Sequence, residues 1–423
     1  MATVTTDTHT SALVAALGGA SQPTDPRREQ AVAALKTLSL PTRKSEDWKY
    51  TSLREVAEQT YIPAPVAALD SIAPYLIPGL DAQVMVFVNG HFDAALSSPT
   101  DVQVLPLTQR QGAAREVFEA HHGQVIAADT DIFAALNMAY AQEGTLVYVP
   151  EGQTLSRPIH IIHLVAGAAD PVALQTRNLF VLGRGASAQV IESIHSTGSA
   201  TSLHNLATEI VVGNHAVLEY VKLQQAGEQA VQIDRTEVEQ GRDSRFSVYT
   251  FSVGGAKTRN NLIVRLQGRH TETHLMGATL LSGQQHVDHF TQMHHLQPDC
   301  FSNELYKGIV DGQATAVFNG KIHVYADAQK TNAFQSNRNI LLSDSANVFT
   351  KPQLEIYADD VKCSHGATTG RIEEEAMFYL QARGIPEKQA RLMLIHAFVM
   401  EVVENLTMEP LRDYIAALVD RRF

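Results

Sequence analysis

The sequence is short of cysteine, of basic charge and of long apolar runs. Its 423 residues include only 2 cysteines, Cys300 and Cys363, which excludes a framework of several disulfides and a zinc site built from four thiolates of this chain. So few cysteines in so long a chain are typical of a reducing compartment. No apolar run approaches the roughly 20 residues of a membrane-spanning helix, and residues 1–10 lack the cationic start and apolar core of a secretory signal. We therefore expect a cytoplasmic protein with no membrane partner.

Acidic residues outnumber basic ones, 45 against 33, and the formal net charge is −12. Proteins that bind a phosphate backbone usually present a basic face, so this balance argues against a nucleic-acid partner. Hydrophobic residues make up 44% of the chain and charged residues 18%, which is typical of a folded globular protein. Because single cores stop growing at about 250–300 residues, the chain is long enough for more than one structural unit.

Several enzyme signatures are also missing. The sequence contains no G-x-x-x-x-G-K-[ST] loop, no G-x-S-x-G turn and no H-E-x-x-H pair. Gly183, Arg184 and Gly185 lie between two expected strands with no helix after them, and this context excludes a dinucleotide-binding turn. These absences argue against a P-loop NTPase and a dinucleotide-binding enzyme and leave other enzyme classes open.

The first third of the chain predicts helices and one strand. A helix is expected to begin at Pro26 with Asp25 as its N-cap, because proline suits the first helical position and aspartate the cap. A second amphipathic stretch covers residues 45–56, and a further helix is expected over residues 131–141. Residues 82–89 (AQVMVFVN) predict a buried strand.

From residue 144 to about residue 360 helical periodicity is almost absent, and short runs rich in Val, Ile, Leu and Tyr alternate with Gly, Asn or Asp. Such runs predict strands. The predicted strands are 146–149, 159–165, 178–182, 188–194, 209–212, 216–223, 245–252, 261–266, 273–281, 320–325, 339–342 and 353–357. Without helical crossovers they form a sandwich, a barrel or a solenoid. The loose spacing favours the solenoid, a parallel β-helix in which each coil buries its inner face against its neighbours.

Helical patterns return after Gly370. Glutamates at 373–375 suit a first helical turn, and Gly384 suits the position just after a helix end. Pro386 opens the next helix, and Pro410 opens a last one. The apolar face expected for the helix after Pro386 consists of Leu392, Ile395, Val399, Val402 and Leu406.

These changes of pattern divide the chain into three parts. We predict a helical and mixed region over residues 1–143, a β-helix core over residues 144–362 and a C-terminal helical module over residues 363–423. The predicted fold is therefore mainly β, with α-helical regions at both ends.

Cys363 and His365 form the first candidate site. If the backbone is extended there, both side chains point to the same side, because side chains in a strand repeat with period two. A thiolate beside an imidazole is half of a soft-metal site, and Lys362 next to it would lower the thiol pKa. The other interpretation is a buried cysteine that packs as a small hydrophobe beside a hydrogen-bonded histidine. The spacing alone favours this structural interpretation.

A second candidate is a histidine-rich stretch near Asp288 and Cys300. Its histidines are His286, His289, His294 and His295. Alternation along a strand places His286 and Asp288 on one face and His289 on the other. A metal site needs ligands that converge, so a structural role is favoured over a metal centre.

A chain of longer motifs carries a family resemblance. Four of the motifs are residues 320–324 (GKIHV), 328–331, 341–343 and 351–356, and they lead into residues 359–368 (DDVKCSHGAT). Two more follow at residues 378–380 and at Arg383-Gly384-Ile385. A further motif lies near the N-terminus, at residues 46–51 (EDWKYT). Together they resemble the SufB and SufD proteins of the SUF iron–sulfur cluster assembly system, and the SufD type in particular. SufB proteins typically carry a His-Glu-Ala stretch where this sequence has Ser364-His365-Gly366-Ala367.

The resemblance implies a right-handed parallel β-helix flanked by helices. It implies a scaffold subunit that is not an enzyme in its own right, in a complex with one SufB-like chain and two copies of a SufC-like ATPase that supplies the ATPase activity, with a possible homodimer of the isolated chain. A transient iron–sulfur cluster would form where the SufB-like and SufD-like chains meet, with Cys363 and His365 as ligands, and none is expected on the isolated chain. The helix after Pro386 would dock the ATPase through Pro386, Ala390, Leu392, Leu394 and Phe398.

Two other functions stay open. A β-helix enzyme such as a polysaccharide lyase would need catalytic side chains along a groove and usually a secretory signal. A self-sufficient homodimeric metalloprotein would use Cys363, His365 and the histidines between residues 286 and 295.

Overall fold

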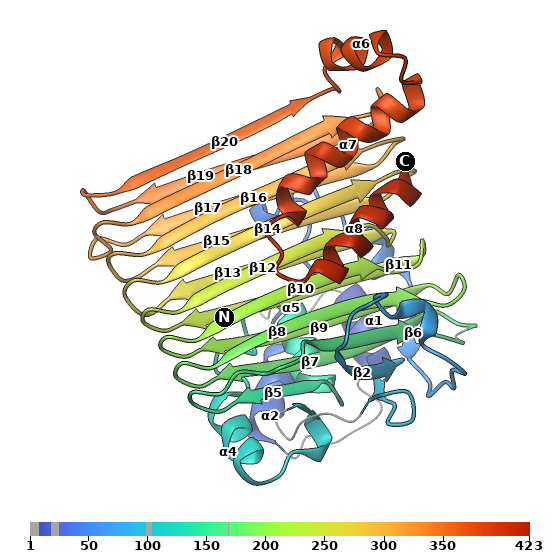
Figure 1. Cartoon of the computed structure of the whole chain (residues 1–423). Helices are drawn as coiled ribbons and strands as arrows, with labels where there is room; N and C mark the ends of the chain where they lie inside the picture. The colour runs from blue at the N-terminus through green and yellow to red at the C-terminus, as the bar shows by residue number, and fades with distance from the viewer. Residues whose placement is uncertain (1–7, 18–24, 99–103, 168) are drawn as a thin grey trace.

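The computed structural model describes residues 8–17, 25–98, 104–167 and 169–423. Successive strands alternate between two long sheets that face each other, so each pair of strands makes one coil of a solenoid (Figure 1). All pairings within the coils are parallel, and only the short pairs β2–β3 and β4–β5 are antiparallel. The predicted parallel β-helix is confirmed.

Sheet A holds the odd-numbered strands except β3, together with β4. Its members are β1 (Ile62–Pro63), β4 (Val104–Pro106), β5 (Thr145–Val149), β7 (Val172–Leu182), β9 (Ser202–Val212), β11 (Ala230–Gln240), β13 (Lys257–Leu266), β15 (His286–His295), β17 (Thr315–Val324) and β19 (Asn347–Ile356). Sheet B holds β2 (Gln83–Val88), β3 (His91–Phe92), β6 (Ile159–Val165), β8 (Ser187–Ser196), β10 (Val217–Gln225), β12 (Arg245–Ser252), β14 (Glu272–Leu281), β16 (Phe301–Val310), β18 (Asn332–Leu341) and β20 (Lys362–Gly370).

One corner of the solenoid repeats the same turn from coil to coil. The residue in the left-handed conformation there is Gly185 in one coil, with φ of 64°, and a non-glycine residue in the coils that follow. Those residues are His215, Asp243, His270, Asp299 and Lys330, with φ between 54° and 62°. Left-handed backbone usually favours glycine. The coils therefore repeat in backbone geometry and not in residue type, which explains why no strict sequence repeat is visible.

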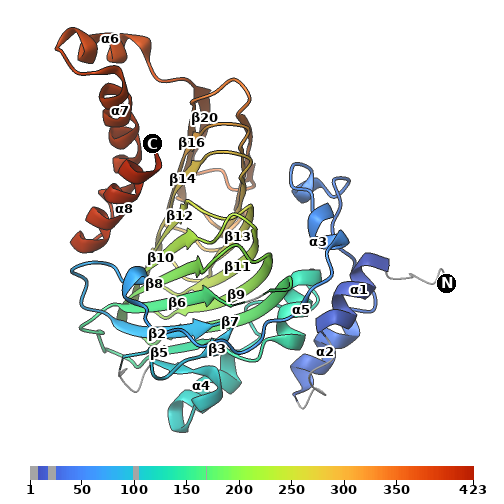
Figure 2. The same cartoon turned by 90° about the vertical axis from the view of Figure 1, so that its right-hand side faces the viewer.

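The two terminal regions cover opposite outer faces (Figure 2). The N-terminal helices α1 (Thr8–Leu17), α2 (Pro26–Ala34), α3 (Arg54–Glu58) and α5 (Ile132–Tyr140) lie on the side of sheet A, and α4 (Gly112–His121) lies near the first coils. The C-terminal helices α7 (Glu387–Val403) and α8 (Glu409–Arg422) lie along sheet B, and α6 (Glu374–Ala382) lies beyond the end of β20. No helix in the described ranges is long and apolar enough to cross a membrane.

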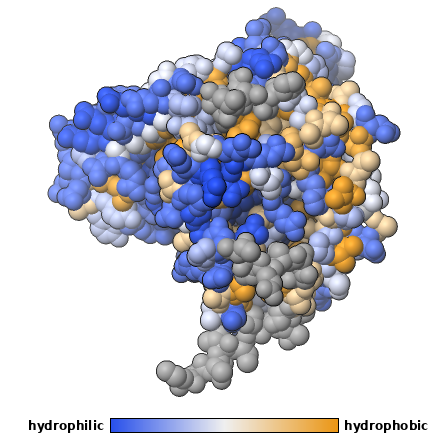
Figure 3. Space-filling view, turned by 90° about the horizontal axis from the view of Figure 1, so that it is seen from below, coloured by the Kyte–Doolittle hydropathy of each residue, from blue (hydrophilic) through white to orange (hydrophobic). Residues whose placement is uncertain are grey.

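Three hydrophobic clusters follow from this arrangement. The largest fills the interior between the sheets and includes Phe180, Phe246 and Ile322. A second joins the N-terminal helices to sheet A, and a third joins α7 and α8 to sheet B. Figure 3, seen from below the view of Figure 1, shows that the outer surface there is largely hydrophilic, with hydrophobic residues gathered toward one side.

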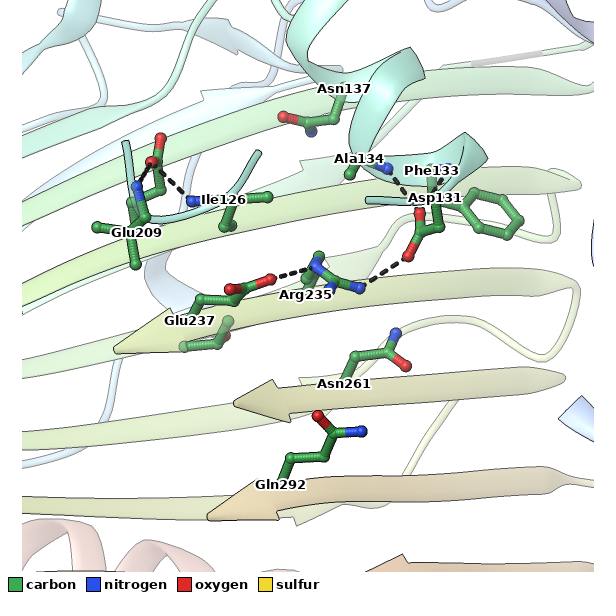
Figure 4. Close-up of polar contacts among 12 residues, drawn as sticks. Ile126, Asp131, Phe133, Ala134, Asn137, Glu209, Arg235, Glu237, Asn261 and Gln292 are labelled. Carbon is green, nitrogen blue, oxygen red and sulfur yellow. Dashed lines mark hydrogen bonds and ion pairs between the residues drawn. The ribbon is translucent and has the colours of Figure 1, made fainter. Parts of the chain in front are cut away.

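Charged groups fix α5 to sheet A (Figure 4). Asp131 caps the helix by accepting from the backbone N–H groups of Phe133 and Ala134 at 2.8 and 2.9 Å. Its other oxygen lies 2.7 Å from Arg235 on β11, which also pairs with Glu237 at 2.7 Å. The predicted helix at 131–141 is therefore confirmed within one residue at each end, and the structure adds the cap at Asp131 that anchors it.

Other local expectations have mixed outcomes. Asp25 caps α2, which begins at Pro26 as predicted. The stretch 45–56 is split into a 3-10 turn, Glu46–Trp48, and the short α3, and Thr51 between them donates to Asp288 on sheet A. Strands β11 and β16 were not predicted from the sequence.

The sheets extend past both predicted divisions of the chain. At the first, β2 pairs with β6 and so belongs to sheet B although it precedes residue 144. At the second, β20 begins at Lys362 and continues to Gly370. The three-part division stays a prediction about folding units.

Candidate functional site

The candidate site lies at the end of the solenoid formed by β19 and β20. These are the last strands of sheets A and B, and each pairs on one side only within the described chain (Figure 1). Eight of the nine residues of β20 are exposed. An uncovered edge of this kind offers unpaired backbone N–H and C=O groups to another chain.

Cys363 and His365 lie on the inner face of β20. On the preceding strand of the sheet, β18, the buried residues are Ala333, Gln335, Asn337 and Asn339, so these point into the solenoid. The register pairs Ala333 with Cys363 and Gln335 with His365. Both candidate ligands therefore lie at the open end of the solenoid interior. They are on the same face of an extended strand, as predicted from the sequence.

The environment of Cys363 does not activate its thiol. Burial raises the pKa of Cys363 above its usual value of 9.0, and a hydrogen bond with the backbone of Ala333 offsets this in part. Lys362, expected to lower this pKa, belongs to the opposite face of the strand, in register with Asn332. The thiol is half-buried against the end of the interior core and is protonated near neutral pH. Binding of a cation beside the sulfur would favour loss of this proton.

The second candidate, the histidine-rich stretch, is divided between the two faces of β15. On the outer face Nε2 of His286 lies 3.0 Å from the hydroxyl of Thr51, and Asp288 pairs with Arg259 and accepts from Thr51. On the inner face the ring of His289 contacts Thr279 at 2.8 Å. The ring of His295 bonds to Ser302 at 2.9 Å, again on the inner face. Burial lowers the pKa of His286 to about 4 and that of His289 to about 3.

These contacts give the histidines structural roles. The remaining member, His294, lies on the outer face beside Tyr325 and Gln292. Cys300 is buried, and its thiol donates to the carbonyl of Gly268 at 3.3 Å and to that of Pro298 at 3.4 Å. Among the residues with described positions, no group of three or more His, Cys, Asp and Glu side chains is placed to hold a metal ion.

The N-terminal motif at residues 46–51 reaches the same end of the solenoid. Tyr50 stacks on Phe349 of β19, with ring centroids 4.4 Å apart and planes 11° from parallel. Glu46 pairs with Lys351 on the same strand at 2.5 Å. The motif therefore fastens the outer face of the last strand of sheet A.

A buried carboxyl group beneath His365 was missed by sequence reasoning. Glu304 of β16 is fully buried and accepts from Thr291 at 2.8 Å and from Gln335 at 3.1 Å. Burial raises the pKa of Glu304 to about 7. A signal in the sequence was the neighbouring strand, residues 332–339 (NAFQSNRN), in which the alternate positions 335, 337 and 339 are all polar. This pattern indicates that the interior of the last coils is polar.

The predicted docking residues lie on and before α7, with graded exposure. Pro386 is exposed, Ala390 is buried, and Leu392, Leu394 and Phe398 are half-buried. The buried face of the helix packs on sheet B and consists of Ile395, Val399 and Val402, with Leu406 beyond the helix end.

Beside α7 lies a groove of about 460 Å³, bounded by residues that include Leu342, Met377, Phe378, Gln381 and Arg391. Phe378 and Tyr379 on α6 are 73% and 58% exposed, so this end carries uncovered aromatic surface.

Comparison with known proteins decides the family. A family model described as the SufBD core domain of SUF system FeS cluster assembly matches residues 164–398, and one described as the SufBD protein N-terminal region matches residues 17–161. The chain belongs to the SufBD family. Cys363, His365 and most of α7 fall within the SufBD core match.

Two curated relatives match this chain over nearly their whole length, and a third matches over part of it. The chain is 33% identical over 399 residues to the iron–sulfur cluster assembly protein SufD of Escherichia coli (strain K12), covering 94% of this chain and 92% of that protein. It is 32% identical over 410 residues to an iron–sulfur cluster assembly SufBD family protein of Synechocystis sp., covering 94% and 90%. A chloroplastic protein of Arabidopsis thaliana is 34% identical over 290 residues, which cover 67% of this chain and 61% of that protein. Within the SufBD family the chain is a SufD homologue.

Proposed function

We propose that this chain is the SufD-type scaffold subunit of a SUF complex, in which it contributes Cys363 and His365 to a nascent iron–sulfur cluster shared with a SufB-like chain. The observation that carries the proposal is the position of these two side chains on the inner face of β20, at an uncovered strand edge. In this proposal the cluster is the product under construction and not a resident cofactor, and the chain has no catalytic residues of its own.

The open end favours pairing with another β-helix. Solenoid coils bury their interior only against neighbouring coils, so an uncovered last coil is incomplete by itself. The polar and half-buried side chains at this end, among them Cys363 and Leu354, cover the interior core only in part. A SufB-like chain with a matching end would extend both sheets and enclose the site. The same edges suit a second copy of this chain, which is the form we propose for the isolated subunit.

The ligand count supports a shared site. Cluster irons are usually held by four protein ligands in total, mostly thiolates, with imidazole replacing some of them. This chain brings one thiol and one imidazole together. The partner would then supply the remaining ligands, and its charges or the incoming iron would lower the raised pKa of the Cys363 thiol.

The C-terminal helices suit the docking of a SufC-like ATPase. The face of α7 that packs on β14 and β16 fixes the helix to sheet B, while Pro386, Leu392 and Leu394 keep exposed area on or just before the helix. An ATPase bound there would act on the same sheet that ends in β20. Such coupling requires that the ATPase contacts differ between two states of the complex. We expect the complex to work in the reducing conditions of the cytoplasm.

The test is anaerobic co-expression of this chain with and without its SufB-like and SufC-like partners, followed by measurement of iron, sulfide and visible absorbance. A cluster should appear only in the full complex and should be lost or greatly reduced in His365→Ala. Ser364→Ala is the matched control, because Ser364 lies between the two ligands on the opposite face of β20. A cluster on the isolated chain, or normal assembly with His365→Ala, would show that the proposed shared site is wrong.

A further inference from the structure

Three residues from successive strands of sheet B form one column that ends at His365. The register pairs Glu304 of β16 with Gln335 of β18, and Gln335 with His365 of β20. Paired residues of neighbouring parallel strands point to the same face and lie about 4.8 Å apart. Glu304 and Gln335 are 0% and 3% exposed, so the column leads from the sealed interior to the open end.

The side-chain amide of Gln335 is held in one orientation. Its Nε2 donates to Oε2 of Glu304 at 3.1 Å. A Cβ atom placed on Gly320 would lie 2.4 Å from the same nitrogen, so the side chain crosses the interior and rests against this glycine. With the nitrogen donating to Oε2 of Glu304, the oxygen Oε1 of Gln335 needs a separate donor, and Oε1 of Glu304 is likewise buried without a hydrogen-bond partner in the described structure.

The oxygen Oε1 of Gln335 is buried, and no hydrogen-bond partner for it exists in the part of the chain that the structure describes. Buried amide oxygens are nearly always satisfied in native proteins. On the side of sheet A, the residue in register above Gly320 is Pro352, which has no N–H to donate, and the hydroxyl of Thr350 on the same face of β19 is buried but forms no hydrogen bond to this oxygen. On the side of sheet B, the next residue in the column is His365, whose ring carries an N–H.

We propose that Gln335 is a positioning residue of the cluster site: its Oε1 accepts a hydrogen bond from a ring N–H of His365, which leaves the other ring nitrogen directed out of the solenoid. This inference rests on the proposed role of His365 as a ligand. Histidines that bind metals usually donate their second N–H to an acceptor of this kind, which selects the tautomer and the ring orientation. Glu304 in turn holds the amide, with Thr291 as the far end of the network.

The direct test is the ring of His365 in the isolated full-length chain, observed by NMR with ¹⁵N-labelled histidine and assigned by the signal missing in His365→Ala. One neutral tautomer should dominate in the native chain. Gln335→Met keeps the length and packing against Gly320 but removes the acceptor, so a mixture of tautomers is expected. Equal tautomer populations in the two chains would overturn the proposal. If Gln335→Met does not fold, Gln335→Asn withdraws the oxygen by one methylene and tests the same contact.

The second measurement is cluster retention in the full complex. Gln335→Met should weaken retention of iron by roughly 10-fold or more, in the range seen for other outer-shell partners of metal-binding histidines. It should cause no further loss when combined with His365→Ala. Asn337→Leu is the matched control, because it also removes a buried amide from β18 but lies beneath Ala367, which has no ring. Equal losses in Gln335→Met and Asn337→Leu would reduce Gln335 to a packing role and overturn the proposal.

The two proposals fail in different ways. If His365→Ala retains its cluster, the shared site is wrong whatever the NMR result, and a tautomer shift in Gln335→Met would then record a hydrogen bond with no role in assembly. If His365→Ala loses the cluster while Gln335→Met keeps it, the shared site stands and the positioning role of Gln335 is refuted.

Discussion

Lys307 on the outer face of β16 donates to the backbone carbonyl of Phe398 on α7 at 2.8 Å, although its side chain is almost completely buried. The same ammonium group pairs with Glu401 one turn later along the helix. Burial lowers the pKa of Lys307, and the pairing with Glu401 offsets this in part. This contact is a polar connection between α7 and sheet B, which ends at the candidate site.

We expect Lys307→Met to loosen α7 without unfolding the solenoid. The variant loses hydrogen bonds to a backbone carbonyl and a carboxylate, which typically costs about 1–3 kcal/mol. Hydrogen exchange should become faster in residues 395–403 and stay unchanged in β18. Arg338→Met is the matched control: Arg338 reaches the same Glu401 at 3.4 Å but is 48% exposed, so its removal should cost about 0–1 kcal/mol. Equal effects of the two substitutions would contradict the prediction.

Glu304 should make the stability of the chain depend on pH. Its pKa rises from 4.5 to about 7 on burial, so the folded chain holds this proton more tightly than the unfolded chain. The stability linked to the protonated group is fully present below pH 4.5 and is lost as the pH rises through about 7. By pH 8 the loss is roughly 3 kcal/mol, because one pKa unit corresponds to about 1.4 kcal/mol.

Glu304→Gln should remove this loss. Urea unfolding of both chains at pH 5, 6, 7 and 8 measures it as a difference in the free energy of unfolding. Buried histidines such as His289 and His295, whose pKa values fall from 6.5 to about 3, act in the opposite sense, since their contribution is present above pH 6.5 and is lost as the pH falls toward 3. They are common to both chains and cancel in the difference. A difference that stays constant with pH would contradict the burial of an ionisable Glu304.

Backbone protection should appear in β20 only on assembly. In the isolated chain at low concentration the exposed amides along its open edge should exchange quickly, whereas the amides of β18, paired on both sides, should exchange slowly. Addition of a SufB-like partner should slow β20 and leave β18 unchanged. Sedimentation at each concentration controls for self-association, which would protect the same edge. Slow exchange of β20 in a proven monomer would contradict an open edge.

The two cysteines should differ in reactivity. Cys363 is half-buried at the open end of the solenoid, whereas Cys300 is buried and its thiol lies within hydrogen-bond distance of two carbonyl oxygens. We expect one thiol per native chain to react with a maleimide, at a rate that increases as the pH approaches the raised pKa of Cys363. Cys363→Ser should abolish this labelling and Cys300→Ser should not. Labelling that the partner chain does not slow would argue against Cys363 at an interface.

Local chemistry explains what could be predicted from the sequence. The cap at Asp25, the helix near residues 131–141 and the return of helices near residue 373 depend on neighbours within a few residues. The common face of Cys363 and His365 follows from the period of a strand. Strands β11 and β16 were not predicted because their inner positions include polar residues, such as Asp234 and Glu304. Their sequences therefore do not alternate between apolar and polar residues.

Long-range register decided the rest. Nothing in the sequence near Thr51 indicates its contact with Asp288, which is 237 residues away. The placement of Gln335 between Glu304 and His365 depends on coils whose lengths keep the strands in register, and a shift of one residue would turn all three side chains to the other face. The sequence by itself thus determined most of the strands and helices and which residue types could act as ligands. Only the tertiary structure decided which of them meet, because the pairing of coils is fixed by packing and hydrogen bonds between residues about thirty positions apart.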